Sequence, residues 1–449
     1  MPGLETDFPM TDAAPPTTDH PPARWGAVLL FLLVVVLLPA TTTAIAVDRF
    51  PALSKYDEFA HIDYLRRIDR GEVPRIGDKI LPETARDVAC RTINGREVVP
   101  CSLEEIPLEV IDAQGYSYEA QQPPLYYAAT SVVRRVFGIA VNGYVNAARL
   151  TGMVWLSAGL AVLWWFFRRR LGAPATVTAV ACALVGLAPV VVGQAGIVNN
   201  DAAGVLIGSV VLVGYERGRR PLNPATLLVM SAVAVVLVLV KPLAVLPIGA
   251  SVLALLFGSE RAGQRWLARA QVLVPAAAAA VTYQAWQLVR DAREVVPYAD
   301  VVEVLLGARE ILDGYPFHAL GVYSSQLLTA FDSGGASYVA GAATTIGLLF
   351  VYTPTIATAL GHGARELRAL QASVVAVAIV APMLLLTQSY FQVQRGGGAN
   401  ARYAIALIPM MVTALAGWLE DKGNRRLAAV AAGVLFVVTM IALLTEDPA

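Results

Sequence analysis

Long apolar runs recur along almost the whole chain, and they restrict the possible fold more than any other feature. A bilayer core about 30 Å thick is crossed by a helix of roughly 20 residues, so an apolar run near that length predicts a membrane span. The sequence therefore predicts an all-α polytopic membrane protein with about eleven transmembrane helices. The predicted spans cover approximately residues 25–47, 143–167, 174–194, 201–215, 225–240, 243–258, 270–289, 337–360, 369–390, 401–419 and 427–445.

Charge content supports the same class. Only 15% of the 449 residues are charged and 56% are hydrophobic, whereas ordinary soluble domains carry about 25% charge. A chain this apolar is neither a soluble globular enzyme nor a disordered protein. Its 34 basic and 34 acidic residues cancel, which excludes a strongly basic nucleic-acid binder. No nucleic-acid partner is expected.

Basic residues in the short loops predict the orientation of the spans. Every second loop is basic, and cytoplasmic loops are the ones that carry an excess of Lys and Arg. The N-terminus is therefore predicted to be cytoplasmic and the C-terminus outside, in a multi-pass protein of the plasma membrane. Residues 125–137 are too short to span, contain Arg134 and Arg135, and predict a helix lying at the interface. The basic loop residues are Arg168–Arg170, Arg217, Arg219, Arg220, Arg261, Arg265, Arg269, Arg365, Arg368, Lys422, Arg425 and Arg426.

The segments outside the spans differ in length and composition. Residues 1–24 hold six prolines and predict a disordered tail. Residues 25–449 are then one transmembrane domain, and its first span is predicted to be a retained anchor rather than a signal peptide. The longer loops, 48–142 and 290–336, fall on the predicted outer side. Because long loops in a compact fold are usually functional or disordered, function is expected on the extracytoplasmic face.

The cysteines fit this map. Cys182 lies in an apolar run and is predicted to be a small core residue. Cys90 and Cys101 both lie in the first outer loop. A disulfide persists outside the plasma membrane, so these two are candidates for a disulfide, with two free thiols as the alternative.

The first outer loop begins with acidic residues at the start of a predicted amphipathic helix. Apolar residues recur every three positions from Phe59 to Ile68, whereas Asp57 and His61 share a different stripe. Asp57 is placed to cap the helix N-terminus, which is the structural alternative to a catalytic role for Asp57 and Glu58. His61 has the same two interpretations, as a packing residue or as a partner of Asp57.

Further polar residues gather at the outer ends of other segments. Tyr126 and Tyr127 follow a Pro-Pro pair and are typical of a membrane boundary. The third span ends in Asn199, Asn200 and Asp201, which either cap the next helix or face the same outer site.

Three cations stand at unusual positions. Lys241 follows seventeen uncharged residues, 224–240, and Pro242 breaks the helix after it. A cation near membrane depth usually has a partner or a ligand, although snorkelling to the headgroups is an alternative. Arg395 and Arg402 lie on the predicted outer side with three glycines between them. Arginine binds phosphate bidentately; the alternative is a flexible turn with a headgroup anchor.

In their order along the chain, these elements resemble the GT-C superfamily of integral membrane glycosyltransferases, in particular the branch of protein O-mannosyltransferases and aminoarabinose transferases. The resemblance covers about residues 25–420. Relatives often carry His or a basic residue where this chain has Gln122. The elements that carry the resemblance are Asp57-Glu58 with His61, Gln122–Tyr127, Asn200-Asp201 and Arg402-Tyr403.

The resemblance implies an inverting transfer of sugar at the outer leaflet. The donor would be a polyprenyl-phosphate sugar bound beside membrane lipid, and the acceptor a cell-envelope glycan, lipid or protein. By the same resemblance Asp57 is the general base, Glu58 supports it or binds substrate, and Asp201 is a second acid of the cavity. The candidates for binding substrate and lipid phosphate are His61, Tyr126, Asn200, Lys241, Arg395, Arg402 and Tyr403.

Two questions stay open at this point. Asp57, Glu58 and His61 could hold a divalent metal, and members of the superfamily differ in this respect. The alternative function is a transporter or lipid flippase, since many spans and an intramembrane lysine suit that class as well. Transporters place their polar groups near the midplane, whereas these cluster at outer span ends. An inactive scaffold of the same fold is a third interpretation.

Overall fold

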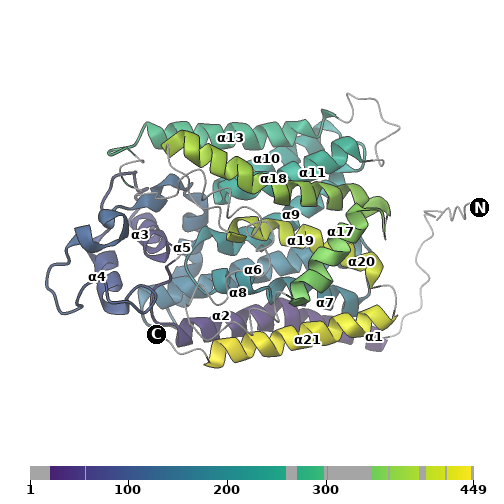
Figure 1. Cartoon of the computed structure of the whole chain (residues 1–449), viewed down its shortest axis with the longest axis horizontal. Coiled ribbons are helices and arrows are strands. Elements are labelled where there is room, and N and C mark those ends of the chain that lie inside the picture. Colours follow the sequence, from purple (N-terminus) through teal and green to yellow (C-terminus); the bar gives the residue numbers. More distant parts are fainter. Residues whose placement is uncertain are drawn as a thin grey trace, which may run out of the picture.

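The structure is a computed structural model, and it describes residues 21–55, 57–258, 270–297, 301, 345–362, 365–393, 401–419 and 422–445. Within these ranges the elements are helices, and the β-structure is limited to isolated bridges. Long helices run side by side in a bundle, while the short helices of residues 50–137 gather at one end of it (Figure 1). The predicted all-α class is confirmed.

The bundle contains helices that suit a bilayer. Three of the described helices are long and apolar enough to cross a membrane, namely Trp25–Arg49, Tyr144–Arg169 and Gly423–Leu444. A bent pair, Ala175–Gly186 and Pro189–Ala195, makes a fourth if it is counted as one span. The chain is therefore a membrane protein, but the described part does not confirm the predicted number of eleven spans.

The first span is one continuous helix made of three segments. Helix α1 (Pro21–Phe31) passes through a π-helical stretch, Leu32–Leu37, into α2 (Leu38–Arg49). It lies beside the last helix, α21 (Lys422–Thr445), along one side of the bundle (Figure 1). Helix α1 begins inside the predicted tail, whose residues 1–20 lie outside the described residues.

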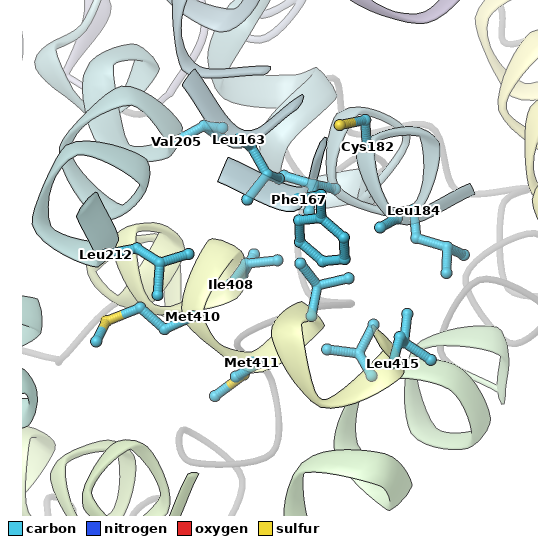
Figure 2. Close-up of a cluster of buried hydrophobic side chains, with 14 of the residues drawn as sticks. Leu163, Phe167, Cys182, Leu184, Val205, Leu212, Ile408, Met410, Met411 and Leu415 are labelled. Atoms are coloured by element: carbon cyan, nitrogen blue, oxygen red, sulfur yellow. The ribbon is translucent and has the colours of Figure 1, made fainter. Parts of the chain in front are cut away.

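The bundle interior is formed by α6 (Tyr144–Arg169), α7 (Ala175–Gly186), α8 (Pro189–Ala195) and α9 (Gly204–Gly218). The predicted span 174–194 is broken between α7 and α8, which are bent by 66° at a break that Pro189 follows, because proline lacks the backbone donor that a continuous helix needs. Phe167 and Cys182 are fully buried in this core (Figure 2). The prediction that Cys182 is a core residue is confirmed.

The later helices complete the bundle. Helices α10 (Pro224–Val240) and α11 (Val245–Phe257) are separate elements, as the Lys241-Pro242 pair predicted. Helices α13 (Leu273–Asp291), α17 (Thr353–Ala359) and α18 (Arg368–Val393) follow. The predicted span 401–419 is divided into 3₁₀ turns and two short helices, α19 (Ile408–Met411) and α20 (Leu415–Trp418). Most of the predicted outer loop 290–336 lies outside the described residues.

The first outer segment folds into α3 (Glu58–Asp69), α4 (Pro82–Arg91), several 3₁₀ turns and α5 (Leu125–Phe137). Helix α5 has the bounds predicted for the interfacial helix. Val132 and Val136 are exposed on it, which suits a helix whose apolar face meets lipid.

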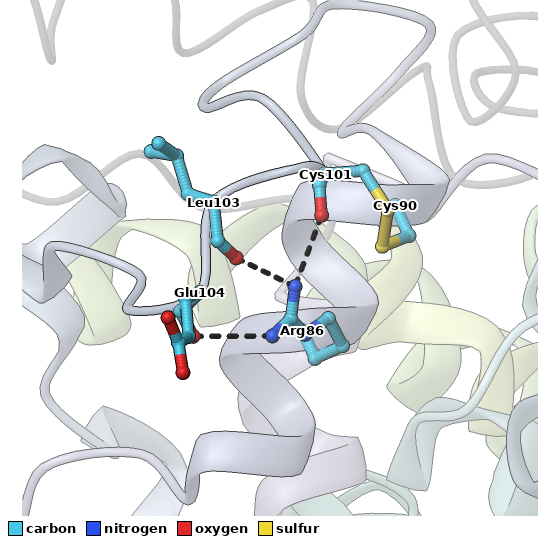
Figure 3. Close-up of a disulfide and its surroundings, with 5 residues drawn as sticks. All are labelled: Arg86, Cys90, Cys101, Leu103 and Glu104. Carbon is cyan, nitrogen blue, oxygen red and sulfur yellow. Dashed lines mark hydrogen bonds between the residues drawn. A yellow bond between two sulfur atoms is a disulfide. The ribbon is translucent and has the colours of Figure 1, made fainter.

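A disulfide joins Cys90 at the end of α4 to Cys101, with the two Cα atoms 4.6 Å apart (Figure 3). Arg86 supports the same excursion, because its guanidinium donates hydrogen bonds to the carbonyl oxygens of Cys101, Leu103 and Glu104. The disulfide and Arg86 therefore attach residues 101–104 to helix α4.

Candidate active site

Asp57 stands immediately before α3 in a left-handed backbone conformation, with φ 62°. Asp57 occupies the predicted N-cap position and its carbonyl oxygen accepts from the N–H groups of Ala60 and His61, but its side chain makes no capping hydrogen bond to the helix. The carboxylate instead accepts hydrogen bonds from Tyr118 Oη at 2.9 Å and from Arg402 Nη2 at 2.5 Å. A non-glycine residue in this conformation is strained, and such strain persists where the surroundings hold it. The strained backbone turns the carboxylate away from the helix and towards these partners.

Glu58 points in another direction and is completely buried. Arg149 of α6 donates to both of its carboxylate oxygens at 2.7 Å, and the backbone N–H groups of Ser54 and Val198 donate at 2.8 and 3.0 Å. The same guanidinium binds the carbonyl oxygens of Phe50 and Ala52. Glu58 and Arg149 therefore fasten the chain just before Asp57 to the bundle.

Asp201 lies in a 3₁₀ turn at the start of α9. Asn199 is the residue that caps this turn, because its Oδ1 accepts from the N–H groups of Asp201 and Ala202. The Asp201 side chain is left to bind Lys241, which reaches it from the end of α10 and also donates to Asn200 Oδ1 at 3.0 Å. Lys241 is thus buried with a partner and does not snorkel to the headgroups.

Arg402 joins the two acids. Its Nη2 binds Asp57, and its Nε lies 3.4 Å from Asp201 Oδ2. The Tyr403 ring is 5.6 Å from the Arg402 guanidinium and 5.8 Å from Lys241 Nζ. Asp201, Lys241 and Arg402 are almost completely buried, whereas 29% of the Asp57 side chain is exposed. Asp57, Asp201, Lys241 and Arg402 therefore form a charge-balanced cluster. Of its two acids, Asp57 is the one accessible to solvent.

A third acid borders this cluster. Glu119 lies in the 3₁₀ turn Tyr118–Gln121 and is buried. Burial, followed by the nearby negative charge of Asp57, raises the pKa of Glu119 to about 8. His61 Nε2 is 3.9 Å from its carboxylate, and His61 Nδ1 pairs with Tyr127 Oη at 2.7 Å. Burial and the charges of Arg402 and Lys241 lower the pKa of His61, so the imidazole is neutral at physiological pH.

The remaining predicted site residues differ in their placement. Tyr126 is buried between the rings of Tyr127 and Trp155, so it supports the site as part of an aromatic core. Asn200 is part of the cluster, and its Nδ2 donates to Gln122 at 3.0 Å. Arg395 lies outside the described residues.

The structure does not gather the metal ligands considered from the sequence. Asp57 binds Arg402, Glu58 binds Arg149, and His61 binds Tyr127, each on a different side. The described residues contain no group of three or more His, Cys, Asp or Glu side chains that could hold a metal ion. These three side chains therefore do not form a ligand set.

Sequence reasoning missed three residues of the site. Arg149 had a usable signal, because a cation inside an apolar span needs a partner just as Lys241 does. Tyr118 and Glu119 precede the Pro-Pro element and had no signal, since their proximity to Asp57 depends on the path of the whole outer segment.

Comparison with known proteins gives structural matches only. No protein-family model and no curated protein sequence matches the chain. It is similar to ArnT from Cupriavidus metallidurans bound to undecaprenyl phosphate, with 17% identity and a TM-score of 0.49 over 93% of this chain and 64% of that one. The archaeal oligosaccharyltransferase AglB from Archaeoglobus fulgidus, in complex with an inhibitory peptide and a dolichol-phosphate, matches with 11% identity and a TM-score of 0.49 over 95% and 56%.

The arabinosyltransferase EmbB from Mycobacterium smegmatis matches with 15% identity and a TM-score of 0.35, over 95% of this chain and 42% of that one. The chain thus spans less than two thirds of the length of each of these structures. All three are GT-C superfamily membrane glycosyltransferases, the superfamily that the sequence resembles.

Proposed function

We propose that this chain is a membrane glycosyltransferase that moves a sugar from a polyprenyl-phosphate donor to a cell-envelope acceptor, with inversion, at the outer face of the membrane. The observation that carries the proposal is the meeting of Asp57, Asp201, Lys241 and Arg402, which come from four distant segments. Two acids and two cations in one cluster, of which only Asp57 is partly exposed, match the charges that such a reaction develops.

Asp57 is the proposed general base. A hydroxyl that attacks the anomeric carbon loses its proton, and a carboxylate within hydrogen-bond reach can accept it. Asp57 suits this role because its side chain is partly exposed while Tyr118 and Arg402 fix its orientation. The new bond joins the acceptor oxygen to the anomeric carbon, the bond from that carbon to the phosphate oxygen breaks, and the acceptor proton moves to Asp57.

The cations are proposed to face the leaving phosphate. The phosphate gains negative charge as the bond breaks, so cations fixed in place lower the barrier. Arg402 and Lys241 are held by carboxylates at the edge of an apolar bundle, where the lower dielectric strengthens their effect. Asp201 keeps both cations in position and adds negative charge near the oxocarbenium-like carbon.

Glu58 is proposed to position Asp57 rather than to touch substrate. Its oxygens already accept hydrogen bonds from Arg149 and two backbone N–H groups. The resulting clamp fixes the residues on both sides of the turn that contains Asp57.

The transporter alternative is less well supported. The cluster is built from the turn before α3 and from the ends of helices, next to the short helices at one end of the bundle (Figure 1). A transport site is expected near the midplane between broken helices.

The test compares cells that lack the chain with cells complemented by wild type or by Asp57→Asn. Loss of the chain is expected to remove one envelope modification and to cause the lipid-linked sugar to accumulate, as measured by mass spectrometry of lipids and glycans. Asp57→Asn keeps the shape of the side chain but not the base, so transfer should fall about 10²- to 10⁴-fold.

Asp78→Asn is the matched control, because Asp78 lies in the same outer segment and pairs with Arg75. It should restore the modification fully. Normal transfer by a stably folded Asp57→Asn variant would remove Asp57 from the mechanism. Unchanged lipids and glycans in the deletion cells would contradict the proposed function itself.

A further inference from the structure

Glu119 is an acid beside the cluster that has no role in the proposed mechanism. It follows Tyr118, the donor to Asp57, and precedes Gln122, which Asn200 and Tyr64 hold through its side-chain and backbone oxygens. Only 6% of Glu119 is exposed. Within the described part of the chain its Oε2 accepts no hydrogen bond. A buried carboxylate oxygen without a donor is costly as an anion, whereas the protonated acid tolerates this environment.

The groups around Glu119 come from several elements, and helix α13 packs against the same turn through Trp286, which donates a hydrogen bond to the Gln121 carbonyl oxygen. Asp57 precedes α3, His61 and Tyr64 lie on α3, Tyr127 on α5, Lys241 at the end of α10, and Arg402 with Tyr403 in the turn before α19. Burial raises the pKa of Tyr118 and Tyr127, and His61 is held neutral, so none of these rings supplies a charge near neutral pH.

The two neighbouring acids are therefore in opposite environments. Asp57 accepts a hydrogen bond from a guanidinium and one from a phenol, and its side chain is partly exposed. Glu119 is desolvated next to that negative charge and keeps its proton. When the environments of two titratable groups in one site favour opposite protonation states, the pair can act as base and acid.

We propose that Glu119 is the general acid of this site and gives its proton to the phosphate oxygen that leaves the sugar. The proposal rests on the proposed function and adds a residue that the resemblance did not assign. As the bond between the anomeric carbon and the phosphate oxygen breaks, that oxygen takes the electron pair and the Glu119 proton. The acceptor proton goes to Asp57. The phosphate is released as a singly protonated monoester, and transfer of a proton from Asp57 through solvent resets Glu119.

This role has a defined pH signature. Glu119 is protonated below its pKa of about 8 and ionised above it. As the pH rises through that value, the new negative charge repels the lipid phosphate and removes the proton that the leaving group needs. Both the affinity for a polyprenyl phosphate and the transfer rate should therefore fall on the alkaline side.

The experiment uses the full chain in lipid nanodiscs with undecaprenyl phosphate as the probe, titrated from about pH 7 to about pH 9.5. Wild type should lose affinity through the pKa of Glu119, and Glu119→Gln, a neutral isostere of the protonated acid, should lack this loss. Transfer by Glu119→Gln should fall about 10²-fold or more. Its melting temperature should match wild type, since no charge or volume is lost at neutral pH. Glu109→Gln is the control, being an exposed acid of the same outer segment.

A Glu119→Gln variant with the pH dependence and the transfer rate of wild type would overturn the assignment while leaving the proposed function intact. Absence of undecaprenyl-phosphate binding and of transfer in wild type would instead sink the proposed function. Glu119→Asp provides a second measurement if the glutamine variant does not fold. The shorter acid should transfer more slowly and keep a decline on the alkaline side, and a rate equal to that of wild type with no such decline would also overturn the assignment.

Discussion

Glu58 and Arg149 form a buried ion pair whose charges are both satisfied by hydrogen bonds. Breaking such a pair leaves one uncompensated charge in the interior and costs about 3–5 kcal/mol. Arg149→Met should therefore lower the free energy of unfolding in detergent by that amount, measured by chemical denaturation. Arg70→Ala is the comparison, because the Arg70–Glu83 pair is exposed and such pairs contribute only about 0–1 kcal/mol.

An equal loss of stability in the two variants would contradict the clamp role of Arg149. A less stable Arg149→Met variant should also lose transfer activity, because the turn that contains Asp57 would be released from the bundle.

At the residue scale the sequence predicted the members of the site better than their contacts. Asp57, Asp201, Lys241 and Arg402 were identified from their positions at span ends, and the structure brings them together. Asp57 takes the predicted N-cap position, but its side chain binds Tyr118 and Arg402 in place of the helix N–H groups, because local propensity does not include the competing attraction of a distant guanidinium. Residue Glu119 could not be found, since a carboxyl group becomes unusual only through neighbours that folding supplies.

At the element scale, Asp69 at the end of α3 holds the interfacial helix α5. It accepts hydrogen bonds from Ser131 at 2.5 Å and from Tyr144 at 2.7 Å, and Arg134 Nε lies 3.2 Å away. Burial alone would raise the pKa of Asp69, but these hydrogen bonds and cations outweigh it, so the pKa lies below its usual value. The contact is then at full strength above the ordinary pKa of aspartate and is lost as the pH falls through the lowered one.

The protection of the α5 amides, expressed relative to the intrinsic exchange rate at each pH, should therefore fall at acidic pH in wild type. Asp69→Asn should have lower protection at neutral pH already, with little further change on acidification. Protection of α5 that is identical in both proteins across this pH range would show that Asp69 does not hold the helix.

The observed helix bounds agree with the predicted ones where a single helix occupies a single apolar run. Helices α5, α6 and α10 lie within two residues of their predicted bounds. The predicted spans 174–194 and 401–419 are broken into shorter helices. Hydropathy indicates whether a run is apolar enough to be buried, but not whether its backbone forms one straight helix. The prolines inside these two runs break the helix, and the hydropathy pattern alone does not predict that break.

At the scale of the whole molecule, a net charge of zero hides a separation of charges between the two ends of the bundle. The acids and buried cations of the site meet near the short helices, whereas the basic loop residues Arg168 to Arg170 follow the opposite end of α6. The charge rule then predicts that the site lies on the outer side of the membrane. Labelling of single cysteines with a membrane-impermeant thiol reagent tests this orientation in intact cells. The native background should be low, because Cys182 is buried and Cys90 is paired with Cys101.

Glu104 is exposed in the outer segment, and Arg170 is exposed in the loop after α6. Glu104→Cys should be labelled in intact cells, and Arg170→Cys only after the membrane is permeabilised. The reverse pattern would place the site in the cytoplasm. In that case the acceptor would be a cytoplasmic molecule, and the disulfide would face a reducing compartment in which it does not persist. Glu104 belongs to the segment before α6 and Arg170 follows α6 directly. One comparison of the two variants therefore decides the orientation, whatever the number of spans.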